Sequence, residues 1–488
     1  MVSTILANLT RPGTFLVEDT AGPRASELAS FNTVYMIGSA STGPYNTPTL
    51  VNSLTDFENQ FGSSPSEASV KLYFRNDRQG ILYFVRSRIA KVFKVTISDV
   101  SVGPAIITIN GTAVTTTLVG TETDLAARSA YIAAINASSV ANAVTAVPAA
   151  ADNEFLIRSD NPENVLTVTE SETELEVADI TPESLPNASD YVYSIENAFD
   201  EAGGRNLAQG FLIAPEAFQN LTVASDRLAV GTAMENLAAD KDFDWLAAVD
   251  CGPNISTVAS LQSDGQQYVT AKGHLAYFAP YLIDLEDGVV PSSAAVAGLA
   301  TKRYREQGYQ QPPAGAKYPV AGVKAVQTRY GNQAQSVLNP LGINLVRYIM
   351  NLGVVVWGSR TRSSDSFYRF VNTRVIMNAL NGSLRDAFDL EIFSAIDGFG
   401  VLFSRIQETA RGICRRFWLS GAFYGNTEEE AFACICNRDN NDPDDLENGS
   451  VVLSVYVAPA PTLEKLLVMT YRTSLGNVQT SASAGQTV

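Results

Sequence analysis

Short apolar runs alternate with helix-like segments over residues 30–90 and 191–330. The runs FNTVYMIGSA and ILYFVRSR predict buried strands. Between them, SLTDFENQFG and SSPSEASVKLYFRND predict helices, with Ser53 or Ser64 as N-cap and acidic residues just inside. The alternation continues in LAQGFLIAP, ASDRLAVGTAMENLAADK and FDWLAAVD. This order predicts an α/β (mixed α+β) fold, with βα units on a mixed sheet.

Residues 91–185 differ in composition from the flanking regions: they are rich in Thr, Val, Ala and Asn and contain no Trp. Asn110-Gly111 separates two β-branched runs, which is the strongest short signal for a hairpin. Residues 123–136 predict one helix, with its apolar positions at Leu125, Ala126, Ser129, Ile132 and Ile135. We therefore predict an inserted β-rich module in this part of the chain.

Charge adds two constraints. The 488 residues carry 34 Lys and Arg against 51 Asp and Glu, a net charge of -17. Residues 91–190 alone hold 4 basic and 14 acidic residues, so they supply -10 of that total. An acidic chain does not coat nucleic acid, so we expect no nucleic-acid partner. Only 17% of residues are charged, which suggests that partners cover much of the surface.

The cysteines and the apolar runs bear on the compartment. Four cysteines in a chain of this length are too few for a disulfide framework and fit folding in a reducing compartment. The start MVSTILANLTRPG has no secretory pattern, and no apolar run reaches the ~20 residues of a membrane helix. We expect a soluble protein, made in the cytosol and without membrane insertion.

Sites for chemistry are not evident. His274 lies in an apolar run without a second metal-ligating residue nearby, which favours a packed side chain. GSASTG at 38–43 lacks the Lys-Ser/Thr of a phosphate loop. Cys434 and Cys436 lie on one strand face without a second pair, and 439–448 favours an Asx-rich turn over a calcium loop. We expect no catalytic residue, cofactor or metal.

Both ends of the chain are extended and strand-like outside any obvious domain. They are RPGTFLVED at 11–19 and KLLVMTYRTS at 465–474. Such strands could pair with an open sheet edge on another subunit, with alternate side chains filling pockets. Those side chains are Phe15 and Val17 at one end and Leu466 and Val468 at the other. Ordinary edge strands within the same chain are the alternative.

Residues 401–421 predict a strongly two-sided helix. At 100° per residue the large apolar side chains share one broad arc. Four arginines occupy the opposite arc: Arg405, Arg411, Arg415 and Arg416. A concentrated arginine face on an acidic chain could dock an acidic partner. Pairing with Asp or Glu of the same chain is the alternative.

Outside 91–185, the sequence resembles the contractile tail sheath family, whose members surround the tube of contractile phage tails and related injection machines. The N-terminal region of the family is similar to three segments of this chain: PGTFLVED, VYMIGSASTGPYNTPTLVNSLTDFENQFG and ILYFVRS. NPLGINLVRYIMNLGVVVWGSRT, followed by YRFVNTR, is the most specific match, with the structural positions Asn339, Gly342, Asn344, Trp357, Arg360, Asn372 and Arg374 at the family's spacing. GAFYGNTEEEAF resembles its closing helix cap, with Thr427 and Glu430 spaced as a capping box.

The resemblance implies a bacteriophage tail sheath or contractile injection system subunit and not an enzyme. It implies a helical homopolymer of stacked, hexameric rings around a tail tube protein, with baseplate and tail terminator proteins at the ends. The particle would be a virion tail or an equivalent, assembled in the host cytoplasm. Terminal arms would donate strands to neighbours, and the four arginines would face the tube.

The residue patterns and the resemblance together predict six segments. They are an N-terminal linking arm (1–20), a core domain in two parts (21–90 and 186–330), an outer inserted module (91–185), a tube-facing sheath domain (331–464) and a C-terminal linking arm (465–488).

Two other functions stay open from the residues alone. One is an α/β enzyme with a small-ligand site in 191–330, and the other is a non-contractile virion structural protein.

Overall fold

The computed structural model describes residues 30–470 except 101, 161, 163, 171–174, 182–184 and 200–206, and also residue 472. An eight-stranded mixed sheet forms the centre of the molecule, in the order β18-β17-β13-β12-β11-β1-β3-β2. The strands from β17 to β3 pair in parallel, and β18 and β2 add antiparallel edges. The predicted mixed α/β fold is confirmed. The strands are β1 (Thr33–Gly38), β2 (Thr49–Val51), β3 (Ile81–Arg86), β11 (Gly210–Ile213), β12 (Leu246–Asp250), β13 (Leu275–Ala279), β17 (Ile343–Ile349) and β18 (Gly353–Val356).

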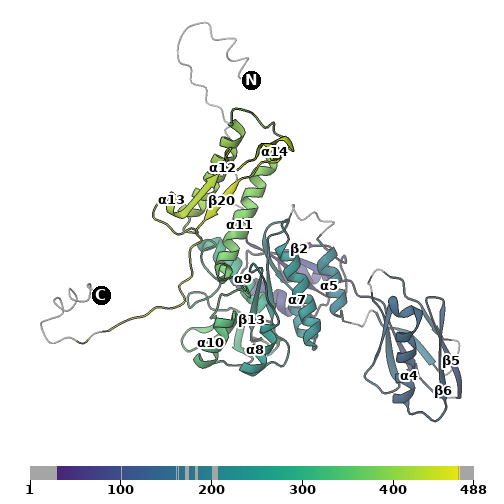
Figure 1. The fold of residues 1–488 in the computed structure, drawn as a ribbon. Helices are drawn as coiled ribbons and strands as arrows, with labels where there is room; N and C mark the ends of the chain where they lie inside the picture. Colours follow the sequence, from purple (N-terminus) through teal and green to yellow (C-terminus); the bar gives the residue numbers. More distant parts are fainter. Residues whose placement is uncertain are drawn as a thin grey trace, which may run out of the picture.

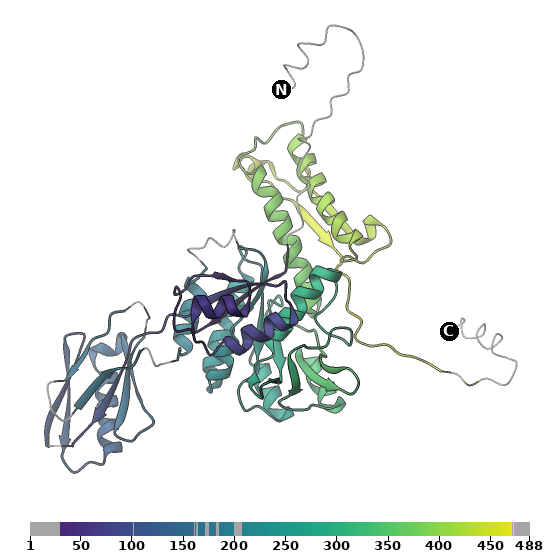
Figure 2. The ribbon, with the colours of Figure 1, turned by 180° about the vertical axis from the view of Figure 1, so that it is seen from behind.

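Helices cover both faces of this sheet. Val34 and Met36 of β1 pack into one apolar cluster, and Tyr35 and Ile37 pack into the other. Because both faces are buried, the strands are continuous apolar runs. Figure 1 shows α5 and α7 on one face, and Figure 2 shows the purple helices α2 and α3 on the other. The helices are α2 (Leu54–Phe61), α3 (Glu67–Asn76) and α9 (Ser293–Gln307) on one side, with α5 (Ala188–Asn197), α6 (Pro215–Asn220), α7 (Ala224–Ala239), α8 (Val258–Gln266) and α10 (Asn332–Leu338) on the other.

A small antiparallel sheet lies beside this body, made of β14 (Leu282–Asp284), β15 (Val289–Val290) and β16 (Val323–Val326).

One of the two predicted helix caps is present. Ser53 is the N-cap of α2, and its side chain accepts the Asp56 N–H. Ser64 is not a cap, because α3 starts two residues later than its position requires and has Ser66 as N-cap residue. The Ser64 hydroxyl instead accepts the Ser66 N–H and donates to the Ser39 carbonyl. It thereby joins the turn before α3 to the loop after β1.

Residues 92–179 form a unit that projects from the main body, as Figure 1 shows. It has an apolar cluster of its own. β5 and β6 pair up to Ile109 and Thr112, and the two residues between them, Asn110 and Gly111, have positive φ. The hairpin predicted there is therefore present, with a type I′ turn. Its strands are β4 (Val92–Ile97), β5 (Val102–Ile109), β6 (Thr112–Val119), β7 (Val144–Pro148), β8 (Glu154–Ser159), β9 (Val168–Glu170) and β10 (Leu175–Asp179).

The helix predicted in this unit exists as α4 (Asp124–Ala137), but of the five predicted apolar positions only Ile135 is buried. The buried positions are Ala127, Tyr131 and Ile135, whereas Leu125 is 48% exposed. The ring of Tyr131 stacks on Phe155, with centroids 5.6 Å apart. In a helix so rich in Ala, that one large ring decides which side is buried.

The C-terminal part of the chain forms a second projecting unit, at the top of Figure 1. The long helices α11 (Val371–Phe388) and α12 (Val401–Leu419) pack together against the short strands β19 (Phe432–Ile435) and β20 (Ser454–Val457). Two short helices, α13 (Glu428–Ala431) and α14 (Pro443–Glu447), precede these strands.

A domain boundary at residue 331 does not match this arrangement. β17 and β18 complete the main sheet, with β17 pairing in parallel to β13. Val371 and Val375 of α11 still belong to the apolar cluster of that sheet, and Asn378 donates to the Trp245 carbonyl. α11 therefore links the main body to the C-terminal unit, and sequence could not show this because the β17 contacts are long-range.

Candidate functional site at the base of the C-terminal segment

The family-motif residues come together where the chain leaves the body for its C-terminal segment. Asn344 of β17 is fully buried, and its amide nitrogen donates to the carbonyls of Tyr277 (3.0 Å) and Arg360 (2.7 Å). Its amide oxygen accepts the Arg360 N–H at 2.7 Å. A buried amide is stable only when its hydrogen bonds are satisfied. Asn344 therefore fixes the strand-like segment around Arg360 against the sheet.

Two glycines allow the close approach. Gly342 ends a 3-10 turn (Asn339–Leu341) with φ of +71°, and a Cβ there would lie 2.4 Å from the Thr361 carbonyl oxygen. At Gly358 a Cβ would meet Asn344 at 3.0 Å. Both positions therefore require glycine, one for its backbone angle and one for space.

The Arg360 side chain then reaches the C-terminal segment. Its Nε and Nη2 donate to the two carboxylate oxygens of Glu464, at 2.9 and 2.5 Å. The side chains are only 12% and 18% exposed. Burial raises the pKa of Glu464, but the hydrogen bonds and charge of Arg360 outweigh it, so the pKa is below its usual value. This two-point geometry is the strong form of an Arg–carboxylate pair.

Asn372 holds the same segment from the start of α11. Its buried amide nitrogen donates to the Ala460 carbonyl at 3.0 Å, and its oxygen accepts the Thr462 hydroxyl at 2.5 Å. Together with Arg360, it anchors residues 460–464 to the body. We refer to residues 460–464 with Arg360 and Asn372 as the anchor.

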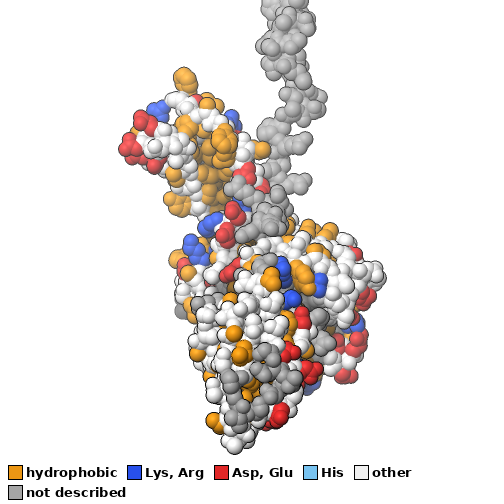
Figure 3. Space-filling view, turned by 90° about the vertical axis from the view of Figure 1, so that its right-hand side faces the viewer, with side chains coloured by type: hydrophobic (Ala, Val, Ile, Leu, Met, Phe, Trp, Pro, Cys, Tyr) orange, Lys and Arg blue, Asp and Glu red, His pale blue; other side chains and the backbone are white. Residues whose placement is uncertain are grey.

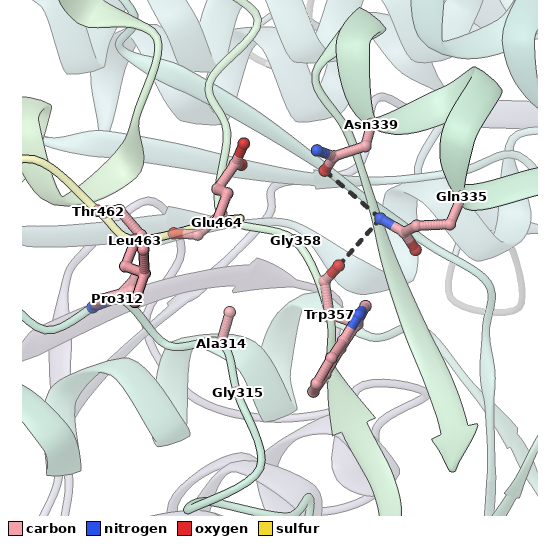
Figure 4. Close-up of a pocket in the computed structure, with 11 residues that line it drawn as sticks. Pro312, Ala314, Gly315, Gln335, Asn339, Trp357, Gly358, Thr462, Leu463 and Glu464 are labelled. Atoms are coloured by element: carbon pink, nitrogen blue, oxygen red, sulfur yellow. Dashed lines mark hydrogen bonds between the residues drawn. The ribbon is translucent and has the colours of Figure 1, made fainter. Parts of the chain in front are cut away.

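A pocket of about 260 Å³ lies beside the anchor (Figure 4). The Gln335 amide donates to the Trp357 carbonyl at 3.0 Å and to Asn339 Oδ1 at 3.4 Å. The indole of Trp357 is 38% exposed. The pocket is lined by Pro312, Ala314, Gly315, Gln335, Asn339, Trp357, Gly358, Ser359, Thr462, Leu463 and Glu464. The opening therefore lies between the body and the anchored segment.

Arg374, the last motif residue, supports the body and not the anchor. Its guanidinium lies over the Tyr368 ring at 4.8 Å, and Nη1 donates to the Lys272 carbonyl at 3.3 Å. Burial lowers the pKa of this group.

Beyond the anchor the chain leaves the body. Residues 465–470 have no regular secondary structure, and the strand predicted at 465–474 is not formed within the described part of the chain. Leu466 and Val468 are 76% and 70% exposed. Phe15 and Val17, predicted for the other arm, lie outside the described residues.

The arginine face predicted on 401–421 is present on α12. Its apolar side is buried, with Ile406, Ile413 and Phe417 among the buried residues. The arginines do have acidic partners in the same chain. Arg405 pairs with Glu391, and Arg411 and Arg415 share Glu428. Two guanidinium groups thus share one carboxylate, and Glu408 and Glu429 lie close to them as well.

Exposed apolar side chains gather on the same unit. Figure 3 shows them in orange at the top of the molecule. The connection from α11 to α12 exposes Leu390, Ile392, Phe393, Phe399 and Val401 by 61–102%. Exposed apolar sets of this kind mark protein contacts.

The predicted capping box at Thr427 is not formed. Thr427 is the N-cap residue of α13, but its side chain makes no cap hydrogen bond. Glu430 accepts the Asn426 N–H instead of the N-cap N–H. Glu430 does occupy the third position of α13, but its carboxylate reaches one residue beyond the N-cap, so the box stays open.

The residues considered for chemistry have structural surroundings. His274 is buried, its Nδ1 is 3.0 Å from the Trp245 carbonyl oxygen, and burial lowers its pKa to about 4. Asn437, Asn440 and Asn441 form an Asx-rich turn between β19 and β20. Among the described residues, no group of three or more His, Cys, Asp or Glu could hold a metal. No helix in the described ranges is long and apolar enough to cross a membrane.

The 191–330 region was the alternative location for an enzyme site. Its buried carboxylates have structural partners. Glu216 accepts hydrogen bonds from Ser39, Ser66 and Tyr191, and Asp264 pairs with Arg227 at 2.6 Å. Nothing in these contacts favours catalysis.

Sequence reasoning missed two parts of this site. Residues 312–315 form a wall of the pocket, because Arg303 donates to the Pro312 and Ala314 carbonyls. Glu464 was not singled out either. Arg360 and Glu464 lie 104 residues apart, so the spacing of residues in the sequence could not indicate that they pair.

Comparisons with known proteins agree with this architecture. No protein-family model matches the chain. The tail sheath protein of Vibrio phage KVP40 is 24% identical over 271 residues, 54% of this chain and 37% of that protein. This chain thus spans little more than a third of that relative's length.

Solved structures match nearly the whole chain. A chain of the contracted helical sheath of the anti-feeding prophage has a TM-score of 0.59 at 19% identity, covering 95% of this chain and 100% of that one. A chain of the contracted PVC sheath complex, an extracellular contractile injection system, has a TM-score of 0.59 at 16% identity, covering 96% and 99%. These likenesses define a class by its fold: the proteins of contractile sheaths. This chain has that fold, as the sequence resemblance predicted.

Proposed function

We propose that this protein is the structural subunit of a contractile tail sheath, which polymerises helically around a tail tube and contracts to drive the tube through a cell envelope. The observation that carries the proposal is the fold shared over 95% of the chain with a protein of a contracted sheath. The anchor gives the proposal a physical basis. It holds the C-terminal segment firmly at 460–464 and releases it, apolar and exposed, immediately afterwards.

The exposed segment suits strand donation. Leu466 and Val468 alternate along it, as side chains do on one face of a strand. In the described part of the chain, β19 and β20 form a sheet of only two strands. Two-stranded sheets are marginally stable and gain from a further strand. The segment from Lys465 onward of one copy would add to the β19–β20 sheet of a neighbour, and the N-terminal arm around Phe15 and Val17 would do the same.

The arginine face would dock the tube. Arg405, Arg411 and Arg415 are 42–51% exposed, so water partly screens their pairs with Glu391 and Glu428. An acidic tube surface could therefore compete for Arg405, Arg411, Arg415 and Arg416. The exposed apolar side chains around Phe393 would add buried area at the same contact.

Contraction then needs no chemistry in the subunit. Stacked, hexameric rings joined by heterologous contacts propagate as a helix. Two packings of the same rigid parts that differ by a few kcal/mol per subunit would store the work. The arms would keep the lattice connected while the Arg face leaves the tube. The unit at 92–179 would decorate the outside. Baseplate and terminator proteins would close the ends of a virion tail or equivalent particle assembled in the host cytoplasm.

Electron microscopy of the purified protein tests the proposal. The full-length chain should form tubes or helical polymers. A variant lacking residues 1–20 should remain a folded monomer that does not polymerise, because one linking strand is missing. Normal tubes from that variant would refute strand donation by the N-terminal arm.

A further inference from the structure

Two thiols meet between α12 and β19. The Sγ atoms of Cys414 and Cys434 lie 3.8 Å apart, within the range of a hydrogen bond between sulfur atoms. All four cysteines of the chain are free. The other two are separate from this contact, because Cys251 is buried beside the main sheet and Cys436 packs into a different apolar cluster.

The two thiols differ in access. Cys414 is fully buried, in the cluster formed by Ile413, Phe417 and their neighbours. Cys434 is half-buried and lines a surface pocket of about 330 Å³ together with Gln407, Arg411, Glu428 and Glu429. A small molecule in the pocket would therefore reach Cys434 first.

The electrostatics favour the same order. The hydrogen bond with Cys414 and the positive charge of Arg411 lower the pKa of Cys434, and they outweigh burial and the charge of Glu408, which raise it. The hydrogen bond with Cys434 and burial raise the pKa of Cys414. The thiolate is the reactive form of cysteine, and a nearby arginine favours it.

We propose that Cys434 and Cys414 form a redox-active dithiol that reacts with small-molecule disulfides of the glutathione type and closes into a disulfide joining α12 to β19. The proposal rests on the local geometry and not on the sheath function. The Cys434 thiolate attacks one sulfur of the small disulfide, forms a mixed disulfide and releases one small thiolate. Cys414 loses its proton to that thiolate and attacks Cys434 Sγ, releasing the second small thiolate, which takes a proton from water.

The sum is two protein thiols oxidised and one small disulfide reduced to two thiols, so atoms and electrons balance. A disulfide bond is about 2.05 Å long, so the sulfurs must approach by roughly 1.8 Å, within the reach of a side-chain rotation. The disulfide would fix α12, which carries the arginine face, to β19.

The test uses the full-length protein, first reduced and then treated with oxidised glutathione. We expect the intact mass to fall by two hydrogen atoms, peptide mapping to link Cys414 to Cys434, and the melting temperature to rise because the link constrains the unfolded chain. Cys414→Ser should stop at the mixed disulfide, with one glutathione on Cys434. Cys434→Ser should not react, and Cys436→Ser should behave as the unmodified protein.

A second measurement needs no variant. Brief alkylation of the native protein should label Cys434 roughly tenfold faster than the three other cysteines. Protein that stays reduced, that keeps glutathione on Cys434 without closing, or that links through Cys436 would overturn the proposal. Equal alkylation of Cys434 and Cys414 would do so as well.

Discussion

Arg360 and Glu464 lie 104 residues apart in the chain and form a two-point ion pair, with N–O distances of 2.9 and 2.5 Å. The Arg360 backbone is in turn fixed by both ends of the Asn344 amide. Two contacts, from Asn344 to Arg360 and from Arg360 to Glu464, thus connect the main sheet to the residue after which the C-terminal segment leaves the body. We therefore expect Arg360 and Asn344 to influence the proposed strand donation, although both lie far from the chain end.

Replacing Arg360 by Ala should release the anchor. Removing one partner of a poorly exposed pair leaves the other without compensation and costs about 1–3 kcal/mol of anchoring free energy. We expect cleavage after Lys465 by trypsin to become about tenfold faster, since 1.4 kcal/mol is a factor of ten. Mass spectrometry of the digest measures this rate. Arg369→Ala, an exposed arginine nearby, is the matched control, and equal rates for the two variants would contradict the role of Arg360.

The anchor should also depend on pH. The folded-state pKa of Glu464 is lowered from its ordinary value of 4.5, since the Arg360 contacts outweigh the effect of burial. A lowered carboxyl pKa contributes stability above 4.5 and loses it as pH falls through the folded value. Hydrogen exchange of the amides at 460–464 should therefore accelerate, beyond its intrinsic pH dependence, between neutral pH and about pH 3. A Glu464→Gln variant should lack this pH dependence, and if it responds as the unmodified protein does, another group controls the anchor.

Asn344→Ala should destabilise the whole main body. The change leaves the Tyr277 carbonyl and both backbone groups of Arg360 without their partner. Each unsatisfied buried group costs about 1–3 kcal/mol. Denaturant unfolding should show a loss of at least about 2 kcal/mol, against less than about 0.5 kcal/mol for Asn236→Ala on the exposed side of α7. A loss as small as that of the control would mean that water replaces the amide.

Neutralising the arginine face should affect docking and not folding. Arg411 and Arg415 are 42% and 49% exposed, and a glutamine at either position can still donate a hydrogen bond to Glu428, so we expect little loss of stability. We expect assembly on the tube to be impaired while tube-free polymers still form, as seen by electron microscopy. A pair of lysine changes on the main body, Lys302→Gln and Lys324→Gln, removes the same charge and should leave tails unchanged. Unchanged tails from the arginine variant would count against tube docking by α12.

The sequence was informative where the determinant is local. Period-two and continuous apolar runs located β1, β3, β11 and β12, and the two-sided pattern located α12 with the correct buried face. Asn-Gly located the hairpin because only a few residue pairs tolerate positive φ at both turn positions. Of the buried positions of α4 the pattern identified only Ile135, because the helix itself is rich in Ala and the ring of Tyr131 decides the packing.

The candidate site was predictable only in part. The sequence around Asn344, Arg360 and Asn372 was identified by its resemblance to the sheath family. The contacts of Arg360 and Asn372 with residues 460–464, however, join positions 88–104 residues apart. The acidic partners of the arginine face, Glu391 and Glu428, lie outside α12, so helical spacing could not identify them. Long-range pairing of this kind appears only once the chain is folded.

The most direct test of the central claim is cryo-electron microscopy of the full-length protein assembled with its tail tube, beside a variant that ends at Glu464. The account predicts a helical sheath in which residues 465–472 of each copy add a strand to the β19–β20 sheet of a neighbour, and dispersed folded monomers for the shortened variant. Dispersed particles from the full-length protein, or an intact sheath from the shortened one, would contradict it.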